Sequence, residues 1–510
     1  MIKSTIISTL SGRVQGYLKD KLSIFKGIPY ASPPIETLRF HAPQEHQGWG
    51  DVLDATKFGP YTPQGFTLLE ETFGFFENQN EDNCLSLNIW TPETENDLRP
   101  VMVYLHGGSF IFGGGADIWY GVDGSELARN EDMVVVTLNY RLGAFGFLYI
   151  EDQTANIGIL DQIAALKWIK NNIEKFGGNP NNITIFGESA GGLSVLILCT
   201  IPLAKGLFHR SIIQSAPIMD TKPTIRSTNK LFQELGIEYG NINGLRDLSV
   251  KKILTAQNRI VNRWISEGVN EIMDFRPSID GKIIPMHPID AIRKGLAKEI
   301  DILIGHNKDE IKLWTALDPI KQNLEKKDLC TVILQRLGKF GDAKLGSDNE
   351  LCKTLVSVYT KNSSENPIEL YDRIDTDFTF GIPSTRVCEG NYKHNPNVYK
   401  YIFTWPSPAY KGKYGSCHIV EIPFAFGTIG KTGAEWFFGA GKEAKSISKN
   451  MMASWAKFAS TGNPNNDFIP EWKAYDVENR TTMFIGKEFT SINAPNDGER
   501  ILWDSVLFNQ

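Results

Sequence analysis

One short stretch of the chain combines a nucleophilic side chain with the small neighbours that such a side chain needs. It reads Gly187-Glu188-Ser189-Ala190-Gly191, a Gly-x-Ser-x-Gly motif. This motif predicts a serine at a sharp turn between a strand and a helix, where the glycines leave the hydroxyl accessible. The helix start would also offer the amide of Ala190 to an oxyanion that develops on a substrate. We therefore expect Ser189 to be a catalytic nucleophile.

The segments on either side of Ser189 fit this interpretation. The apolar run Ile183-Thr184-Ile185-Phe186 precedes the motif and predicts a strand, and the run from Leu193 to Leu198 follows it and predicts a helix. The alternative is a surface serine in a glycine-rich turn. That alternative is disfavoured, because the strand and the helix stand where the motif requires them.

A second glycine-rich segment could supply further hydrogen-bond donors. His106-Gly107-Gly108-Ser109-Phe110 follows the predicted strand Val101 to Leu105. A serine hydroxyl is nearly inert at neutral pH, so the reaction needs a base and stabilisation of the developing charge. Small residues at Gly108 and Ser109 would let main-chain N–H groups approach a substrate oxygen. A phosphate-binding loop is disfavoured because no Lys-Ser or Lys-Thr pair follows; a purely structural turn stays open.

Alternating apolar runs and helical patterns predict an α/β protein with a large, mostly parallel central sheet flanked by helices. The clearest helix is an amphipathic one over Ile159 to Phe176, where apolar residues recur at helical spacing before Gly177-Gly178. Strands are expected at 101–105, 133–138, 183–186, 302–304, 398–403 and 482–485.

Two long stretches lack strand signals, at approximately 220–300 and 313–397, and their polar sequence is compatible with helices. No linker or change of composition marks a boundary at either stretch. We therefore expect one domain over residues 1–510, with both stretches as helical insertions over the active site that form its cap and walls.

Composition and charge exclude several classes of function. Lys and Arg number 53 and Asp and Glu number 59 in 510 residues, so the net charge of −6 disfavours a nucleic-acid partner. The longest apolar stretch, between Glu188 and Lys205, is too short and too interrupted for a membrane span. The six cysteines form no CxxC pair, which predicts reduced thiols and no zinc site. The N-terminus has no secretion signal, so a cytoplasmic location is expected.

Matches to a known family occur at many separate places along nearly the whole chain. They are Phe25-Lys26-Gly27-Ile28-Pro29-Tyr30-Ala31, Leu38-Arg39-Phe40, Val52-Leu53-Asp54-Ala55-Thr56, Asp161-Gln162, Lys205-Gly206-Leu207-Phe208, Gln214-Ser215, Trp455 with Phe458, and Thr461-Gly462-Asn463-Pro464-Asn465. In these segments the sequence resembles the type-B carboxylesterase family of the α/β-hydrolase fold, and within it bacterial carboxylesterases and para-nitrobenzyl esterases. Glu36 and Ile311 stand where that family commonly has glycine, and Ser109 replaces a glycine of the oxyanion loop.

The resemblance also selects a base and an acid. Five histidines follow Ser189, and composition alone does not choose among them. The segment around His418, followed by Glu421, Pro423 and Phe424, resembles the family segment that contains the catalytic histidine. Glu310 stands at the position of the family's catalytic acid, with Asp309 as the local competitor. By the same resemblance, Ser215 would support Glu310 from behind.

The resemblance implies a serine carboxylester hydrolase that acts through an acyl-enzyme on broad, small-to-medium esters. Ser189, Glu310 and His418 would be the triad, and the amides of Gly108, Ser109 and Ala190 would form the oxyanion hole. No metal and no cofactor is required, and the partner is a small ester. The sequence leaves the oligomeric state open. The alternatives are a lipase or an amidase of the same fold, or a non-catalytic binding member of the family.

Overall fold

The computed structural model describes residues 4–65, 78–93, 98–116, 121–219, 224–266, 275–339, 345–361, 366–504 and 506. The chain forms two compact units. Unit 1 comprises residues 1–211 and 222–286, and unit 2 comprises residues 212–221 and 287–510. This division into units does not test whether residues 1–510 form one domain, so the single domain expected from the sequence stays a prediction.

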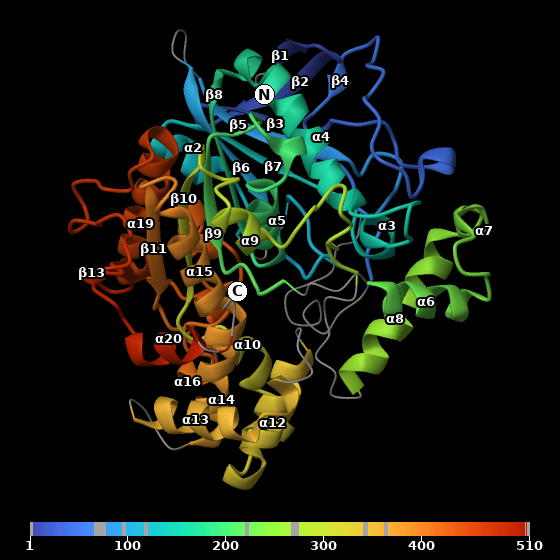
Figure 1. Ribbon diagram of the computed structural model, residues 1–510. Coiled ribbons are helices and arrows are strands. Elements are labelled where there is room, and N and C mark those ends of the chain that lie inside the picture. The colour runs from blue at the N-terminus through green and yellow to red at the C-terminus, as the bar shows by residue number, and fades with distance from the viewer. Residues whose placement is uncertain are drawn as a thin grey trace. The chain divides into compact units, whose positions relative to one another are not determined.

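Unit 1 is built on a mixed sheet with the strand order β1-β2-β3-β5-β7-β6-β8 (Figure 1). Successive pairs from β1 to β7 are antiparallel, whereas β6 runs parallel to both β7 and β8. The strands are β1 (Ser4–Thr9), β2 (Gly12–Lys19), β3 (Leu22–Pro29), β5 (Ser86–Pro92), β6 (Arg99–Leu105), β7 (Val134–Leu138) and β8 (Gly178–Glu188), and β4 (Leu53–Asp54) pairs with β2.

The parallel strands of unit 1 are those that the sequence predicts. All five residues of β7 are buried, and so is every residue of β6 except Pro100. A strand covered on both faces needs apolar side chains in both directions, which gives the continuous hydrophobic runs. β8 contains the predicted strand at 183–186 and ends immediately before Ser189.

Unit 1 also contains helices. They are α2 (Ser125–Glu131), α3 (Gly143–Phe147), α4 (Ile157–Asn172), α5 (Ala190–Leu198), α6 (Ile225–Leu235), α7 (Ile242–Arg246) and α8 (Val250–Ser266), with 3₁₀ turns η1 (Glu36–Leu38), η2 (Ile173–Phe176) and η3 (Pro202–Ala204). The predicted helix at 159–176 is confirmed as α4 and η2. However, the predicted amphipathic character is wrong: 11 of the 16 residues of α4 are buried, and one of them is Asp161, whose carboxylate pairs with Arg141.

Unit 2 has its own run of strands in the order β9-β10-β11-β12-β13. The strands are β9 (Arg210–Gln214, in unit 2 from Ile212), β10 (Asp301–Asn307), β11 (Val398–Phe403), β12 (Thr482–Ile485) and β13 (Phe489–Ile492). β10, β11 and β12 are parallel, and β13 is antiparallel to β12. The predicted strands at 302–304, 398–403 and 482–485 are therefore confirmed.

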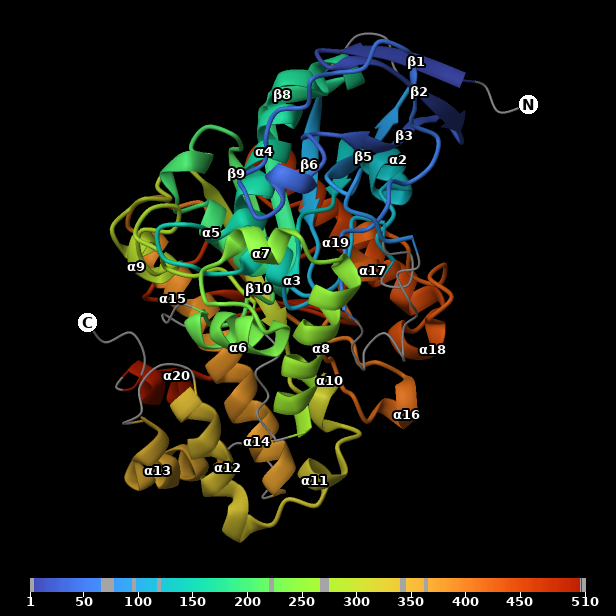
Figure 2. The ribbon, with the colours of Figure 1, turned by 90° about the vertical axis from the view of Figure 1, so that its right-hand side faces the viewer.

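The described parts of the two long stretches contain helices and no strand, as the sequence predicts, although residues 275–287 have no regular secondary structure. In unit 1, α6 and α8 pack together within the first stretch. In the second, α12, α13 and α14 lie side by side (Figures 1 and 2) around buried residues such as Leu355, Tyr359 and Phe378. The position of both stretches over the active site stays a prediction. The helices of unit 2 are α9 (Pro288–Arg293), α10 (Lys312–Thr315), α11 (Pro319–Gln322), α12 (Lys326–Lys339), α13 (Asn349–Thr360), α14 (Pro367–Thr376), α15 (Ile382–Asn391), α16 (Ala409–Gly412), α17 (Ile422–Phe426), α18 (Glu435–Phe438), α19 (Lys442–Thr461) and α20 (Asp497–Asp504), with η4 (Leu345–Ser347) and a π-turn, η5 (Asp377–Gly381).

No helix within the described ranges is long and apolar enough to cross a membrane.

Candidate active site

Ser189 forms the turn between β8 and α5 in unit 1. Its backbone has φ 57° and ψ −122°, a conformation that residues other than glycine rarely adopt. Such strain costs on the order of 1–3 kcal/mol and persists where the surroundings hold it, most often at functional sites. The strain therefore singles out Ser189 as a residue that the fold holds in a fixed position.

The two glycines of the motif are required by close packing around this turn. A Cβ atom on Gly191 would lie 1.9 Å from the carbonyl oxygen of Leu105, and one on Gly187 would lie 2.6 Å from the same oxygen. Any larger residue would push the turn away from the end of β6. The glycines thus let the turn pack directly on the strand that leads into the loop at residues 106–109.

The loop that follows β6 lies against the serine turn. A Cβ atom on Gly107 would lie 2.8 Å from the carbonyl oxygen of Glu188 and 3.2 Å from the Cβ of Ser189, so a larger residue would push the loop away from the serine turn. Gly108 and Ser109 both have positive φ, 101° and 54°. Ser109 therefore adopts, with a side chain, a backbone conformation that residues other than glycine rarely take.

Three main-chain donors at this place have no acceptor. Within the described residues, the amides of Gly108, Ser109 and Ala190 donate no hydrogen bond. Ala190 is the first residue of α5, where an N–H has no partner inside the helix. Unused main-chain donors are uncommon in folded proteins. Three of them at one place indicate that these amides can donate to an oxygen atom of a ligand.

A buried histidine anchors this loop. The His106 ring stacks on Tyr140 with ring centroids 4.3 Å apart, its Nδ1–H donates to the carbonyl of Gly107 at 2.8 Å, and Tyr140 donates to the His106 carbonyl at 2.7 Å. Burial lowers the pKa of His106 to about 4, so the ring is neutral at pH 7. His106 therefore shapes the loop without adding charge.

In unit 2, Glu310 lies in the turn that follows β10. Its side chain is fully buried, and Oε1 accepts a hydrogen bond from the backbone N–H of Asn307 at 2.6 Å. A carboxylate that accepts main-chain hydrogen bonds is held in one orientation. The turn therefore points the other oxygen, Oε2, in a fixed direction.

That oxygen meets the imidazole of His418. Glu310 Oε2 and His418 Nδ1 are 2.6 Å apart, and both side chains are at most 3% exposed. The backbone N–H of His418 also donates to the carbonyl of Glu310 at 3.2 Å. With the carboxylate ionised, Nδ1 bears the proton, so Nε2 of a neutral ring can act as the base.

The competing acid, Asp309, has other partners. Its Oδ2 accepts the backbone N–H of Ser416 at 2.9 Å, and its Oδ1 pairs with Lys312 Nζ at 2.9 Å. Asp309 thus links the turn after β10 to the segment before His418 by a hydrogen bond, whereas Glu310 contacts the imidazole of His418 itself.

Aromatic side chains enclose the His418 ring. Trp314 and Phe380 each place a ring centroid 5.1 Å from the imidazole centroid. Both come from the second helical stretch. Apolar walls of this kind keep water away from the Glu310–His418 pair, which strengthens its hydrogen bond.

A second buried carboxylate, Glu421, lies behind this pair. Asn307 Nδ2 donates to Glu421 Oε2 at 2.6 Å, and Gln214 Nε2 donates to Oε1 at 3.2 Å. Burial, and then the charge of Glu310, raise the pKa of Glu421 to about 7. Asn307 therefore contacts both carboxylates, and the sequence analysis missed this role because the contact with Glu421 joins residues 114 positions apart.

Ser215, expected to support Glu310, is completely buried next to β9 with a positive φ of 48°. Its N–H donates to the carbonyl of Gly305 at 2.8 Å, but in the described part of the chain its hydroxyl has no hydrogen-bond partner. The supporting role stays a prediction.

The structure thus brings the predicted residues together in two groups. Unit 1 contains Ser189 with the amides of Gly108, Ser109 and Ala190, and unit 2 contains Glu310 with His418. Among the residues described, no group of three or more His, Cys, Asp or Glu side chains is placed to hold a metal ion.

Comparison with known proteins finds similarity over the whole chain. The model of the carboxylesterase family matches residues 3–501. The chain is 38% identical to the para-nitrobenzyl esterase of Bacillus subtilis, covering 97% of both chains, and 32% identical to the phenmedipham hydrolase of Pseudarthrobacter oxydans, covering 96% of both. A solved carboxylesterase from Geobacillus stearothermophilus superposes with a TM-score of 0.85 and 34% identity, covering 98% of this chain and all of that one.

Proposed function

Since the chain belongs to the carboxylesterase family and is a carboxylic ester hydrolase of the α/β-hydrolase fold, we propose that it works through an acyl-enzyme on Ser189. His418 is the general base and Glu310 is the acid that orients it. The observation that supports this best is the buried 2.6 Å contact between Glu310 and His418. A carboxylate fixed against Nδ1 selects the tautomer in which Nε2 can take a proton.

The reaction proceeds in two halves. The Ser189 hydroxyl gives its proton to Nε2 of His418 while its oxygen attacks the ester carbonyl carbon. The tetrahedral intermediate then expels the alcohol, which receives that proton. In the second half, water gives a proton to His418 and attacks the acyl-enzyme, and the acid leaves as Ser189 recovers its proton. Glu310 stays ionised throughout and stabilises the imidazolium.

The unused amides support the placement of the oxyanion hole. Gly108, Ser109 and Ala190 would each donate to the carbonyl oxygen as it becomes negative. Because these donors belong to the backbone, the Ser109 side chain does not remove one. Such preorganised donors are worth on the order of 10²–10³ in rate each.

The proposed substrates are small-to-medium esters. The relatives named above hydrolyse para-nitrobenzyl esters and phenmedipham, as their names state, and this chain covers almost all of each. A lipase or an amidase would need the same triad, so the distinction lies in the substrate pocket. The cytoplasmic location stays a prediction from the sequence.

The test combines covalent labelling with turnover. A fluorophosphonate should label one residue per chain, and mass spectrometry should place the label on Ser189. Ser189→Ala should lose labelling and lower the hydrolysis of p-nitrophenyl acetate by several decades, on the order of a triad deletion. A non-catalytic binding protein would show no stoichiometric adduct. A series of p-nitrophenyl esters of increasing chain length, with a matched anilide, would distinguish an esterase from a lipase or an amidase.

A further inference from the structure

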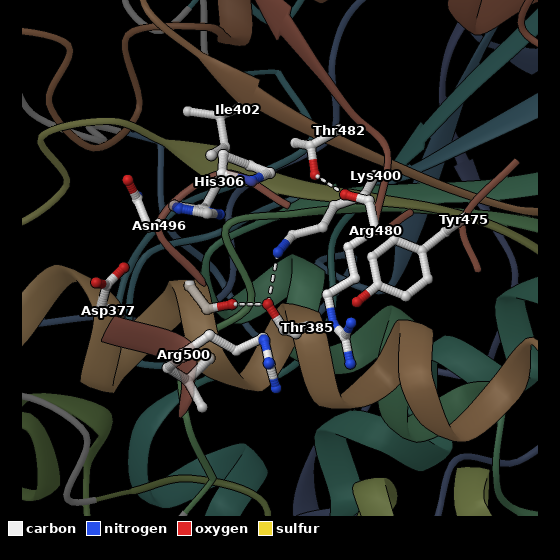
Figure 3. A pocket seen from close by; sticks show the side chains of 13 residues that line it. His306, Asp377, Thr385, Lys400, Ile402, Tyr475, Arg480, Thr482, Asn496 and Arg500 are labelled. Atoms are coloured by element: carbon white, nitrogen blue, oxygen red, sulfur yellow. Dashed lines mark hydrogen bonds between the residues drawn. The ribbon is translucent and has the colours of Figure 1, made fainter. Parts of the chain in front are cut away.

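A polar cavity in unit 2 is lined by residues that the proposed mechanism does not use. Its volume is about 30 Å³, and it is partly open to solvent. The lining side chains come from β10, β11, β12, the π-turn η5, α15 and α20, and from the segment around Tyr475 and Arg480 (Figure 3). Segments far apart in the sequence thus meet around one small space.

Lys400 is the least compensated charge in this cavity. It lies on β11, is 7% exposed, and uses one donor, from Nζ to Thr385 Oγ1 at 2.5 Å. In the described ranges no ion pair within 4.0 Å joins its Nζ to a carboxylate. Burial lowers the pKa of Lys400, and the more distant charges of Asp377 and Glu389 offset this only in part. An ammonium group has three donors, and a buried charge without a counter-charge is costly. Lys400 therefore has both spare donors and an unmet need for negative charge.

Two guanidinium groups line the same space (Figure 3). Arg500 is paired with Asp497 and Asp504 at 2.6 Å, whereas Arg480 has only Glu389, at 3.6 Å, as a carboxylate partner in the described ranges. Arg480 and Lys400 thus remain weakly compensated.

Asp377 is the one carboxyl in the cavity lining, and Tyr359 already donates to it at 2.6 Å. Burial raises the pKa of Asp377 to about 6, so this carboxyl takes up a proton more readily than an exposed aspartate does. The lining itself has three basic side chains and this one carboxyl, but Arg480 and Arg500 are also paired with carboxylates outside the lining, so the charge that an added anion would balance is chiefly that of Lys400.

Two neutral groups in the lining have unused hydrogen-bonding capacity. His306 Nδ1 and the Tyr475 hydroxyl are buried, and neither has a partner within the part of the chain that the structure describes. Burial lowers the pKa of His306 to about 3, so its ring is neutral and one nitrogen can donate. Buried polar groups normally have a partner, and two without one at the same cavity indicate a molecule that binds there.

The chemistry of the lining decides what kind of molecule fits. Water could satisfy His306 and Tyr475, and 30 Å³ accommodates about two waters, but water brings no charge for Lys400. A metal cation is disfavoured beside an ammonium and two guanidinium groups. We propose that this cavity binds a small oxyanion, a carboxylate or inorganic phosphate, whose oxygens accept from Lys400, Arg480 and Tyr475.

Thermal unfolding with titrated anions tests this proposal without depending on esterase activity. The full chain is titrated with sodium phosphate and with sodium acetate, and with sodium chloride at equal ionic strength. A ligand that binds only the folded protein raises Tm in a saturable way. We expect phosphate or acetate, but not chloride, to do so, and the anion that saturates at the lower concentration identifies the preferred oxyanion.

The variants separate a site from a general salt effect. Lys400→Met should weaken half-saturation at least tenfold, and Lys473→Met, which changes an exposed lysine, should leave it unchanged. If Lys400→Met does not fold, Tyr475→Phe replaces it, with the same expected direction. The proposal is overturned if neither anion exceeds chloride in the wild-type protein, or if the cavity variant saturates at the wild-type concentration.

Discussion

Replacing Glu310 by glutamine tests the hydrogen-bond network around His418, the proposed base. Glu310 accepts at both oxygens, from His418 Nδ1 and from the Asn307 N–H, each at 2.6 Å. Glutamine has one oxygen and one NH₂ group. If the oxygen keeps Asn307, the NH₂ group faces Nδ1 and forces the ring proton onto Nε2, where the base is needed. If the oxygen faces His418, two buried donors oppose each other at Asn307.

Either arrangement also removes the charge that stabilises the imidazolium. We therefore expect Glu310→Gln to lower kcat/KM by about 10³–10⁴, or roughly 4–5.5 kcal/mol of transition-state stabilisation, as for the same change in other triads. The assay is hydrolysis of p-nitrophenyl acetate, with circular dichroism to verify folding.

Asp309→Asn is the matched control, because Asp309 lies in the same turn but contacts Ser416 and Lys312 instead of the imidazole. It should retain activity within a few-fold of wild type. The reasoning is refuted if Glu310→Gln stays within tenfold of wild type, or if Asp309→Asn loses as much.

Three further changes probe the framework of the site. Asp161→Ala should lower the free energy of unfolding by about 3–5 kcal/mol in urea, because it leaves the Arg141 guanidinium, 2.6 Å from the Asp161 carboxylate, buried and unpaired. The control is the double variant Asp161→Leu/Arg141→Met, which should lose less stability; an equal loss would contradict the argument. Glu36→Gly should raise the free energy of unfolding by about 0.5–1 kcal/mol, because Glu36 is exposed and has a strained φ of 50°. Glu36→Ala keeps the Cβ atom and should not raise the free energy of unfolding, so equal gains in the two variants would refute strain as the cause. Glu421 should make the protein less stable as the pH rises, because its pKa is raised from 4.5 to about 7 and the unfolded chain loses this proton first. Glu421→Gln should therefore flatten the loss of stability between pH 4.5 and 7 by at most ~3 kcal/mol, and an unchanged slope would count against a raised pKa.

The sequence predicts the parallel strands better than the antiparallel ones. β11 and β12 begin and end where their apolar runs do, because strands buried on both faces leave a continuous signal. β1 has no fully buried residue, so its six residues lack such a run. The sequence analysis therefore missed the antiparallel strands of unit 1.

The same distinction applies to the site. Ser189 is predictable because its turn is encoded by neighbours in the sequence, whereas Glu310 and His418 required resemblance to a family. Asn307 and Glu421 are brought together over 114 positions by packing, and nothing local indicates their contact. The same holds for Lys400. In the sequence it is one polar residue in an apolar strand, and only the fold shows that it lines a cavity.

A crystal structure of the protein inactivated by a phosphonate ester tests the central proposal most directly. The account predicts phosphorus bonded to Ser189 Oγ, the phosphoryl oxygen about 2.7–3.1 Å from the amides of Gly108, Ser109 and Ala190, and His418 Nε2 within hydrogen-bonding distance of Ser189 Oγ or of the alkoxy oxygen. Phosphorus on another residue, or an imidazole that stays out of reach in the adduct, would contradict it.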